Sequence, residues 1–192
     1  MRRSGTTGPQ ALIPGRLGKL PTAAISDALD REGIPGALEG LAPLSDDFRV
    51  AGPAFTIRDV TVWGGIMTEV ASIRGIAGTV INGVCRDVAA SLAHRYPLFS
   101  RGRFMRTGKD RVRLVSVRRQ LTISGVGAAP ARSCAPTPRR RRRARSVRER
   151  IADVAERIEQ AESQIVAAVR AGSTLRQARE TFGYHRLQRR RS

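Results

Sequence analysis

Aromatic residues are scarce in this sequence of 192 residues, where Phe, Trp and Tyr together make up 4%. Proteins that bind single-stranded nucleic acid commonly stack bases on aromatic side chains, and this composition offers few such platforms. A core must therefore be built from Ala, Val, Ile and Leu. The hydrophobic share of 41% is sufficient for one domain of this length, which excludes a wholly disordered chain.

Cysteine and long apolar runs are also lacking. The two cysteines, Cys85 and Cys134, form no C-x-x-C pair and have no histidine at ligand spacing, which excludes a zinc ribbon and argues against a disulfide scaffold. The first twenty residues contain no apolar stretch of the secretory type. Arg74 and Arg86 interrupt the most apolar region, so no membrane segment is expected. These features together predict a cytoplasmic protein.

Lysine is rare, because only Lys19 and Lys109 among the 35 basic residues are lysines and the others are arginines. Against 16 acidic residues the net charge is +19. Much of this surplus is local, since residues 132–150 hold nine arginines and one glutamate. The distribution indicates a basic segment and not a uniformly basic protein of the histone type.

Short hydrophobic patterns alternate between helical and extended periodicity in the first two thirds of the chain. Helices are expected at 22–30, 66–74 and 88–94. Strands are expected at 48–60, 97–100, 112–117 and 120–124. The apolar run 76–84 is bounded by glycines and is typical of a strand buried on both faces. This alternation predicts an α/β layer fold over residues 17–127.

The remaining segments have different compositions. Residues 1–16 are expected to form a flexible leader, and residues 128–146, rich in Pro and Arg without periodicity, a disordered segment. Residues 147–192 are predicted to be a C-terminal helical region that begins with a long helix to Ala171. Its apolar positions recur in steps of three and four, at Val147, Ile151, Val154, Ile158, Ala161, Ile165 and Val169. Such a stripe seals a core or contacts a partner helix.

Four motifs in a fixed order resemble the RraA-like family. They are Thr22-Ala-x-x-Ser-Asp-Ala-Leu-Asp30, Val50-Ala-Gly-Pro-Ala-Phe-Thr56, Trp63-Gly-Gly-Ile66 and Gly75-Ile-Ala-Gly-Thr-Val-Ile-Asn-Gly-Val-Cys-Arg-Asp-Val88. One motif alone is weak, whereas the ordered set is specific. The resemblance covers residues 17–127 and 147–190. The family includes 4-hydroxy-4-methyl-2-oxoglutarate/4-carboxy-4-hydroxy-2-oxoadipate aldolases, proteins labelled dimethylmenaquinone methyltransferase, and the regulator of ribonuclease E activity.

The resemblance implies a layered β/β/α swivelling-domain fold with a long C-terminal helix, assembled as a homotrimer or hexamer with sites between subunits. The implied activity is that of a divalent-metal-dependent lyase that cleaves a 4-hydroxy-2-oxo acid to pyruvate, with oxaloacetate decarboxylase activity as a further possibility. A small 2-oxo acid would then be the substrate. A metal near a carboxylate would stabilise the pyruvate enolate as a Lewis acid.

The family's central Arg-Asp pair falls on Arg86 and Asp87. The resemblance implies that Asp87 anchors Mg²⁺ or Mn²⁺, largely through water, and that Arg86 holds the carboxylate and oxo group of the substrate with its forked donors. Backbone N–H groups of the turn Gly64-Gly65-Ile66-Met67, at the start of a helix, would add to the substrate-binding site.

Other interpretations of the same residues stay open. Without the resemblance, Arg86-Asp87 is a surface pair or a helix cap, and Gly64-Gly65 is an ordinary turn. His94 and His185 are isolated and are interpreted as structural or surface residues, not metal ligands. At the level of function, the alternatives are a non-catalytic regulator that binds a ribonuclease or RNA, and an RNA binder acting through 139–150.

Two departures from the family pattern are visible. Between Val60 and Trp63 the family has roughly thirty more residues, about one β-α-β crossover. Residues 129–146 replace a strand pair of the form Pro-Gly-Asp-x-Val-x-Ala-Asp-x-Asp-Gly-Val-Val-Val-Val-Pro. With codons assumed for a GC-rich gene, neighbouring reading frames of 130–138 and 139–144 encode Gly-Glu-Ile-Val-Arg-Ala-Asp-Ala and Gly-Val-Val-Val-Val-Pro. We hypothesise that the arginine run is altered-frame coding.

Altered-frame coding predicts that RNA binds Arg139–Arg143 only non-specifically. Affinity for several unrelated RNAs should be similar, and it should fall steeply between low and moderate salt because counterion release drives the binding. Fluorescence anisotropy with labelled RNAs measures both properties. A sequence preference that survives the added salt would contradict the hypothesis and indicate a selected basic patch.

Overall fold

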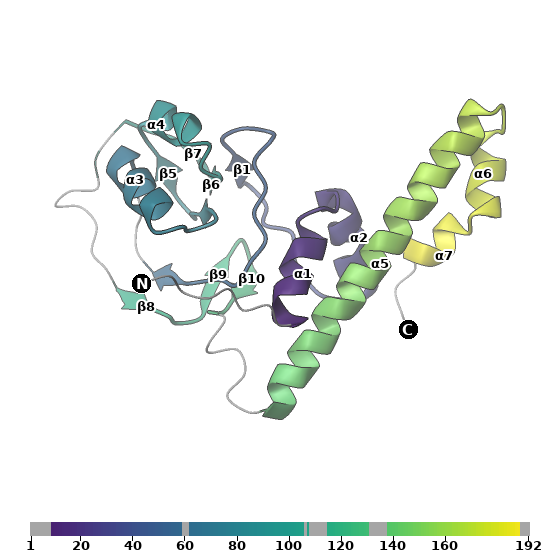
Figure 1. The fold of residues 1–192 in the computed structure, drawn as a ribbon, viewed down its shortest axis with the longest axis horizontal. Helices are drawn as coiled ribbons and strands as arrows, with labels where there is room; N and C mark the ends of the chain where they lie inside the picture. The colour runs from purple at the N-terminus through teal and green to yellow at the C-terminus, as the bar shows by residue number, and fades with distance from the viewer. Residues whose placement is uncertain (1–8, 59–61, 106, 108–114, 131–137, 189–192) are drawn as a thin grey trace. The chain divides into compact units, whose positions relative to one another are not determined.

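The chain divides into two compact units in the computed structural model, which describes residues 9–58, 62–105, 107, 115–130 and 138–188 (Figure 1). One unit joins residues 1–37 to 137–192, and the other comprises 38–136. The predicted combination of helices and strands with a long C-terminal helix is confirmed. The unit boundaries differ from the predicted domains, because residues 17–127 contribute to both units.

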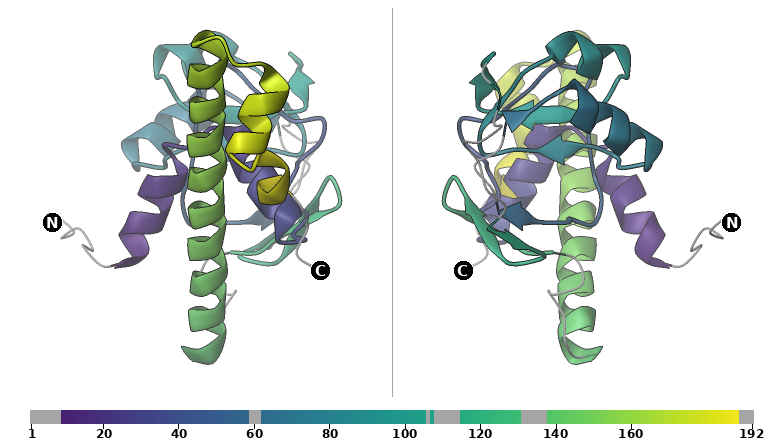
Figure 2. Two further views of the ribbon diagram at one scale, coloured as in Figure 1. Left: turned by 90° about the vertical axis from the view of Figure 1, so that its right-hand side faces the viewer. Right: turned by 90° about the vertical axis from the view of Figure 1, so that its left-hand side faces the viewer.

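The first unit is helical over its described residues. It contains α1 (Pro9–Leu17), α2 (Thr22–Arg31), α5 (Pro138–Arg170), α6 (Leu175–Thr181) and α7 (Tyr184–Gln188). Figure 2 shows α5 as one long helix, with α6 and α7 folded back beside it. Thr174 begins α6 with a capping box, in which its hydroxyl and backbone exchange hydrogen bonds with Gln177.

The core of the helical unit lies between α2 and α5. It consists of Leu20, Ala24, Ala28, Ile151, Val154, Ala155 and Ile158. The predicted apolar stripe is therefore confirmed over most of its length, and it seals this core against α2. Its last member, Val169, is 40% exposed, so the buried stripe ends with Ile165.

The predicted flexible leader is wrong for residues 9–16, which form most of α1. Ile13 is buried, and the Arg16 guanidinium donates hydrogen bonds of 2.7–2.8 Å to Asp153 and Glu156 on α5. These bonds lower the pKa of Glu156, because the guanidinium favours the ionised carboxylate. The composition of the leader suggested a loose segment, but contacts with a helix distant in sequence order it.

The predicted disorder of 128–146 is also wrong in part. Helix α5 begins at Pro138 and so includes Arg139–Arg143, nine residues before the predicted start at Val147. Proline is favourable in the first turn of a helix, and arginine has a high helix propensity, so the segment extends a helix that is already packed further along. Residues 128–130 complete and follow a strand, and 131–137 lie outside the described residues.

The described residues of the second unit form short strands in four sheets. Their bounds are β1 (Ala42–Pro43), β2 (Ile57–Arg58), β3 (Val62–Trp63), β4 (Thr79–Val80), β5 (Val84–Cys85), β6 (Leu98–Ser100), β7 (Gly102–Arg103), β8 (Ser116–Val117), β9 (Leu121–Ile123) and β10 (Val126–Ala128). The orders are β1-β6-β4, β3-β5-β7, β2-β8 and β10-β9. Strand β1 is antiparallel to β6, whereas β4 and β6, and β3, β5 and β7, are parallel. Within the described part of the predicted strand at 48–60, only Ile57–Arg58 is extended, as β2, and residues 59–60 and 112–114 of the predicted strands lie outside the described residues.

Two helices, α3 (Gly65–Ile73) and α4 (Val88–Ala93), pack together in this unit. They agree with the helices expected at 66–74 and 88–94. The core beside them consists of Leu44, Trp63, Ala71, Ile81, Cys85, Tyr96 and Leu98. The segment from β4 to β5 lies beside the segment from β6 to β7. Between the two strand pairs, the Arg101 N–H donates a hydrogen bond of 2.8 Å to the Gly83 carbonyl.

The apolar run 76–84 is not buried on both faces, which corrects the prediction from its composition. Ile81 is buried, but the neighbouring Val80 is 40% exposed and Ile76 is 48% exposed. The run also bends at Asn82 and Gly83, so that it is divided into β4 and β5. Alternation of buried and exposed side chains is expected where a strand is covered on one face.

A tight hairpin joins β9 and β10 through Ser124 and Gly125. Ile123 is paired with Val126, and both loop residues have positive φ, at 48° and 78°. This is the type I′ geometry that suits two-residue hairpins, and glycine at the second position adopts it without steric cost. Among the described helices of the chain, none has both the length and the apolar composition required to cross a bilayer.

Replacement of Ile158 by Ala should destabilise the helical unit by about 2–5 kcal/mol, because Ile158 is fully buried between α2 and α5 and its truncation leaves a cavity. Urea unfolding followed by circular dichroism measures the change. Val166→Ala on the same helix is the matched control, since Val166 is 48% exposed and its truncation should change the free energy of unfolding by less than about 1 kcal/mol. Equal effects of the two changes would contradict the assigned core.

Candidate functional site

Two parallel strands bring the predicted site residues together. Strand β3 leads through Gly64 into α3, and the adjacent β5 leads through Arg86 and Asp87 into α4. The Arg86 N–H donates to the Trp63 carbonyl at 2.8 Å, which fixes the two strand ends beside each other. The carboxyl ends of parallel strands are the usual location of ligand sites in α/β sheets. Gly64, Gly65, Arg86 and Asp87 therefore meet at one edge.

The carboxylate of Asp87 contacts the neighbouring helix and not its own. Its Oδ2 accepts a hydrogen bond of 3.0 Å from the Gly65 N–H at the start of α3, and lies 3.5 Å from Arg86 Nε. Asp87 occupies the N-cap position of α4, but its side chain makes no capping hydrogen bond there. The interpretation as a simple helix cap therefore does not explain this side chain.

The backbone of Asp87 is left-handed, with φ of 53° and ψ of 42°. Aspartate tolerates this region better than most residues other than glycine, yet the conformation is uncommon and carries a cost. Left-handed residues of this kind occur at sites where surrounding structure determines the backbone. Here the conformation turns the chain from β5 into α4 and places the carboxylate next to Gly65.

Gly64 is required by close packing and not by its backbone angles, because its φ of −138° is open to any residue. A Cβ atom at this position would lie 2.9 Å from Asp87 Oδ2 and 3.2 Å from Arg86 Nε. Both distances are shorter than normal contacts. The absence of a side chain at Gly64 thus makes room for the Arg86–Asp87 pair.

Positive charge and N–H donors surround this position. The first amides of α3 have no acceptor within the helix, and the dipole of α3 adds partial positive charge at the same end. Gly65 uses its amide on Asp87, which leaves those of Ile66 and Met67 as donors without an intrahelical acceptor. The side chain of Arg86 is 36% exposed. The arrangement can bind a small anion such as a carboxylate.

A hydrated divalent cation fits one position of the site. Asp87 is 48% exposed, and the hydrogen bond and ion pair of its carboxylate both involve Oδ2. Mg²⁺ commonly takes one or two carboxylates and retains several waters, so a single accessible carboxylate is compatible with it. In the described part of the chain, no three His, Cys, Asp or Glu side chains come together as a metal cluster. His94 Nε2 lies 2.7 Å from Glu69 Oε2, a contact that fits the interpretation of His94 as a structural or surface residue.

A chain of buried polar side chains lies behind the site, and the sequence did not suggest it. Trp63 Nε1 donates to Thr68 Oγ1 at 2.9 Å, and Thr68 Oγ1 is 2.8 Å from Ser91 Oγ. Trp63 also stacks on Tyr96, with ring centroids 6.0 Å apart and planes within 5°. The only signal in the sequence was spacing, since Thr68 and Ser91 each follow a site residue by four positions.

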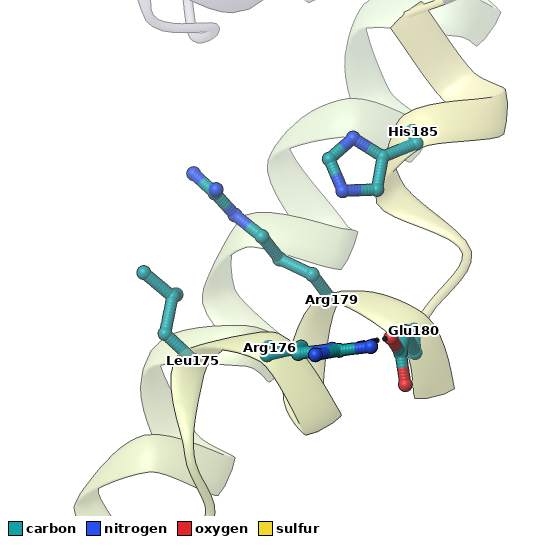
Figure 3. Close-up of a pocket in the computed structure, with 5 residues that line it drawn as sticks. All are labelled: Leu175, Arg176, Arg179, Glu180 and His185. Atoms are coloured by element: carbon teal, nitrogen blue, oxygen red, sulfur yellow. Dashed lines mark hydrogen bonds and ion pairs between the residues drawn. The ribbon is translucent and has the colours of Figure 1, made fainter.

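A concave feature lies in the helical unit. A pocket of about 390 Å³ is lined by Leu175, Arg176, Arg179, Glu180 and His185 (Figure 3). Arg176 and Glu180 form an ion pair of 3.1 Å, but their side chains are 88% and 63% exposed, so the pair is weak. His185 is exposed, which fits its interpretation as a structural or surface residue.

Close to this pocket, Tyr184 links two helices of the unit. Its phenol donates a hydrogen bond of 2.6 Å to Glu162 on α5, and the Arg179 guanidinium lies 5.6 Å from the centre of its ring. The hydrogen bond to the carboxylate raises the pKa of Tyr184 to about 12. These contacts hold α6 and α7 against α5 and have a structural function.

The comparisons with known proteins agree with the motifs. Residues 58–133 match the family described as RraA-like: Aldolase/RraA. A crystal structure of an uncharacterized protein from Pseudomonas syringae pv. tomato is 35% identical, with a TM-score of 0.76, over 88% of this chain and 97% of that one.

Two curated proteins are similar in sequence. Protein DlpA of Legionella pneumophila is 32% identical over 85% of this chain and 32% of its own length. A protein of Halalkalibacterium halodurans named "Putative 4-hydroxy-4-methyl-2-oxoglutarate aldolase" is 32% identical over 43% of this chain and 53% of its own length. The chain thus spans about a third of the first relative and about half of the second.

Replacement of Gly64 by Ala should displace the Asp87 carboxylate, because the added Cβ would lie 2.9 Å from Oδ2. The proton shift of the Gly65 amide, which donates to this carboxylate, should move upfield in a ¹⁵N-correlated NMR spectrum. Gly52→Ala is the matched control, since a Cβ there meets no atom within 4 Å, and it should leave the Gly65 signal unchanged. An unchanged signal in folded Gly64→Ala would show that the close packing is not needed for the contact.

Proposed function

The chain belongs to the RraA-like family, and we propose that its Arg86–Asp87 site catalyses the metal-dependent cleavage of a 4-hydroxy-2-oxo acid to pyruvate. One observation carries the proposal: the Asp87 carboxylate is held by the first amide of α3 beside the Arg86 guanidinium, and not as a cap of its own helix. The Halalkalibacterium relative with an aldolase name supports the same class of reaction.

Substrate binding is assigned to Arg86 and to the start of α3. A guanidinium presents forked donors that match a carboxylate and an adjacent oxo group. The amides of Ile66 and Met67, together with the dipole of α3, add donors for the same anionic end. Gly64 carries no side chain, which leaves room for Arg86 and Asp87 beside the start of α3.

The reaction breaks the bond between C3 and C4 of the substrate. The C4 hydroxyl gives its proton to a water molecule and becomes the oxo group of the second product, while the electron pair of the broken C3–C4 bond moves to C3 and the C2 oxygen as the enolate of pyruvate. Protonation at C3 then completes the product. Arg86 and the α3 amides bind the carboxylate of the substrate. They therefore lie next to the C2 oxygen and stabilise the negative charge that develops there. Decarboxylation of oxaloacetate passes through the same enolate and would use the same groups.

Asp87 is the residue that would hold Mg²⁺ or Mn²⁺, with water completing the coordination. When bound, the cation supplies Lewis-acid stabilisation of the enolate oxygen. The Gly65 amide occupies Oδ2 of Asp87 and thereby orients the carboxylate. The positive φ of Asp87 also contributes to this orientation, because it sets the direction in which the side chain leaves the backbone.

We also propose that the chain assembles into a homotrimer or hexamer. The support is the exposed apolar surface of α3, where Ile66 is 81% exposed, Ile73 is 76% exposed and Val70 is 39% exposed. Helical spacing places these three residues on one face. A second copy of the chain over this face would remove apolar surface from water next to the half-exposed site.

The wild-type protein should release pyruvate from 4-hydroxy-4-methyl-2-oxoglutarate only when Mg²⁺ or Mn²⁺ is present, as followed by a lactate dehydrogenase coupled assay. Asp87→Ala should lower kcat/KM by about 100-fold or more, because it removes the anchor of the cation. Arg86→Lys should lower kcat/KM by about 10- to 100-fold, because an ammonium cannot make the forked contact. Turnover that persists in a strong chelator would exclude the metal role.

The controls are an exposed acid and an exposed arginine of the same unit. Asp47→Ala and Arg74→Lys change charge or donor geometry away from the proposed site and should leave kcat/KM unchanged. Wild-type activity in Arg86→Lys would remove Arg86 from substrate binding. Absence of pyruvate release by the folded wild-type protein with either metal would overturn the proposed activity and favour a non-catalytic regulator.

A further inference from the structure

The buried chain behind the site involves three side chains from two helices and a strand. Thr68 and Ser91 are fully buried, and Trp63 is 8% exposed. The indole donates to the Thr68 hydroxyl at 2.9 Å, and that hydroxyl is 2.8 Å from the Ser91 hydroxyl. Each polar group thus has a partner at normal hydrogen-bond distance, as buried polar groups require.

The two hydroxyls occupy equivalent positions in their helices. Thr68 follows Gly64 by four residues, and its backbone N–H donates to the Gly64 carbonyl at 3.1 Å, which closes the first turn of α3. Ser91 follows Asp87 by four residues in α4. Residues four apart lie on the same side of a helix, one turn along. The hydroxyl contact therefore joins α3 and α4 one turn beyond the contact between Gly65 and Asp87.

We propose that Thr68 and Ser91 are positioning residues for the Arg86–Asp87 site. Their contact holds the first turns of α3 and α4 at a fixed separation, and this separation sets the 3.0 Å distance between the Gly65 amide and Asp87 Oδ2. Neither residue reaches the exposed pair, so both act through the backbone of their helices. As a role in catalysis, this inference rests on the proposed function.

Hydrophobic packing alone explains these residues less well. Two apolar side chains of similar shape would fill the space between the helices without the cost of burying hydroxyls. A hydrogen bond differs from apolar contact in that its strength depends on distance and angle, so it restricts sliding of one helix along the other. The indole of Trp63 extends this restriction to β3, the strand that leads into Gly64.

The test compares Thr68→Val, which removes the hydroxyl at nearly constant volume, with a buried hydroxyl elsewhere in the unit. Thr56 is 5% exposed, and its hydroxyl donates to the Arg119 carbonyl at 2.6 Å, so Thr56→Val is a matched control. For each variant the thermal midpoint, the Gly65 amide proton shift and exchange rate, and kcat and KM for pyruvate release with Mg²⁺ are measured. Thr68→Ser restores the hydroxyl.

We expect both valine variants to lower the thermal midpoint, but only Thr68→Val to move the Gly65 amide upfield and to increase its exchange rate. In that variant kcat should fall about tenfold with KM changed less than twofold, because Arg86 stays fixed by its backbone bond to Trp63. Thr68→Ser should restore the wild-type Gly65 amide signal and the wild-type kcat. Ser91→Ala should reproduce the effects of Thr68→Val, and it provides the test if Thr68→Val does not fold.

An unchanged Gly65 amide in folded Thr68→Val or Ser91→Ala would overturn the inference, as would an equal change in Thr56→Val. If the wild-type protein releases no pyruvate, the proposed activity fails, but the amide measurements still decide whether Thr68 and Ser91 set the position of Gly65. If the amide moves and kcat does not, the contact is structural only and the positioning role in catalysis is overturned.

Discussion

The hydrogen bond from the Gly65 amide to the Asp87 carboxylate connects the starts of two helices, and the geometry around the candidate site depends on it. It requires that β3 and β5 run parallel and end together, because only then do their loops meet. It requires a residue without a side chain at Gly64, where a Cβ would collide with the carboxylate. It also accounts for the left-handed backbone of Asp87, which turns that carboxylate away from its own helix.

The two units are stabilised in different ways. The helical unit has a continuous apolar interface, in which the stripe of α5 packs on α2 around Ala28 and Ile158. The strands of the other unit are only two or three residues long, so each pair of strands forms few backbone hydrogen bonds. Side-chain contacts supplement them there, as where the Arg101 guanidinium donates to Asn82 and to Ser124, and so ties the β9–β10 hairpin to the bend between β4 and β5.

Much of the helix content could be predicted from the sequence, whereas the bounds of several elements could not. The 3.6-residue period of α5 predicted its buried face correctly as far as Ile165, because a long amphipathic pattern places its apolar residues on a single face of one helix. The start of α5 was missed because arginine-rich sequence carries no periodicity. The order of α1 depends on Arg16 meeting Asp153 and Glu156, and no local pattern contains information about partners so distant along the chain.

The candidate site was predicted as a set of residues but not as a geometry. The motif order placed Gly64, Gly65, Arg86 and Asp87 together in advance, and the parallel pairing of β3 with β5 brings them into contact. The buried support was not predicted, since an isolated Thr68 or Ser91 in a helix has many possible roles. Only the packing of α3 on α4 distinguishes a buried hydroxyl pair from two surface residues.

The helical unit is assembled from the two ends of the chain, with residues 38–136 inserted between them. During synthesis α1 and α2 therefore leave the ribosome long before α5, the helix that covers their apolar faces. Residues such as Ala24 and Ala28 stay without their partners until residues 151–158 of α5 have been synthesised. Early folding of the inserted unit would bring the ends of α2 and α5 nearer to each other and reduce the entropy cost of closing that long loop. The inserted unit thus has a part in the folding of the helices, and a change that slows its folding would prolong the exposure of an apolar helix pair.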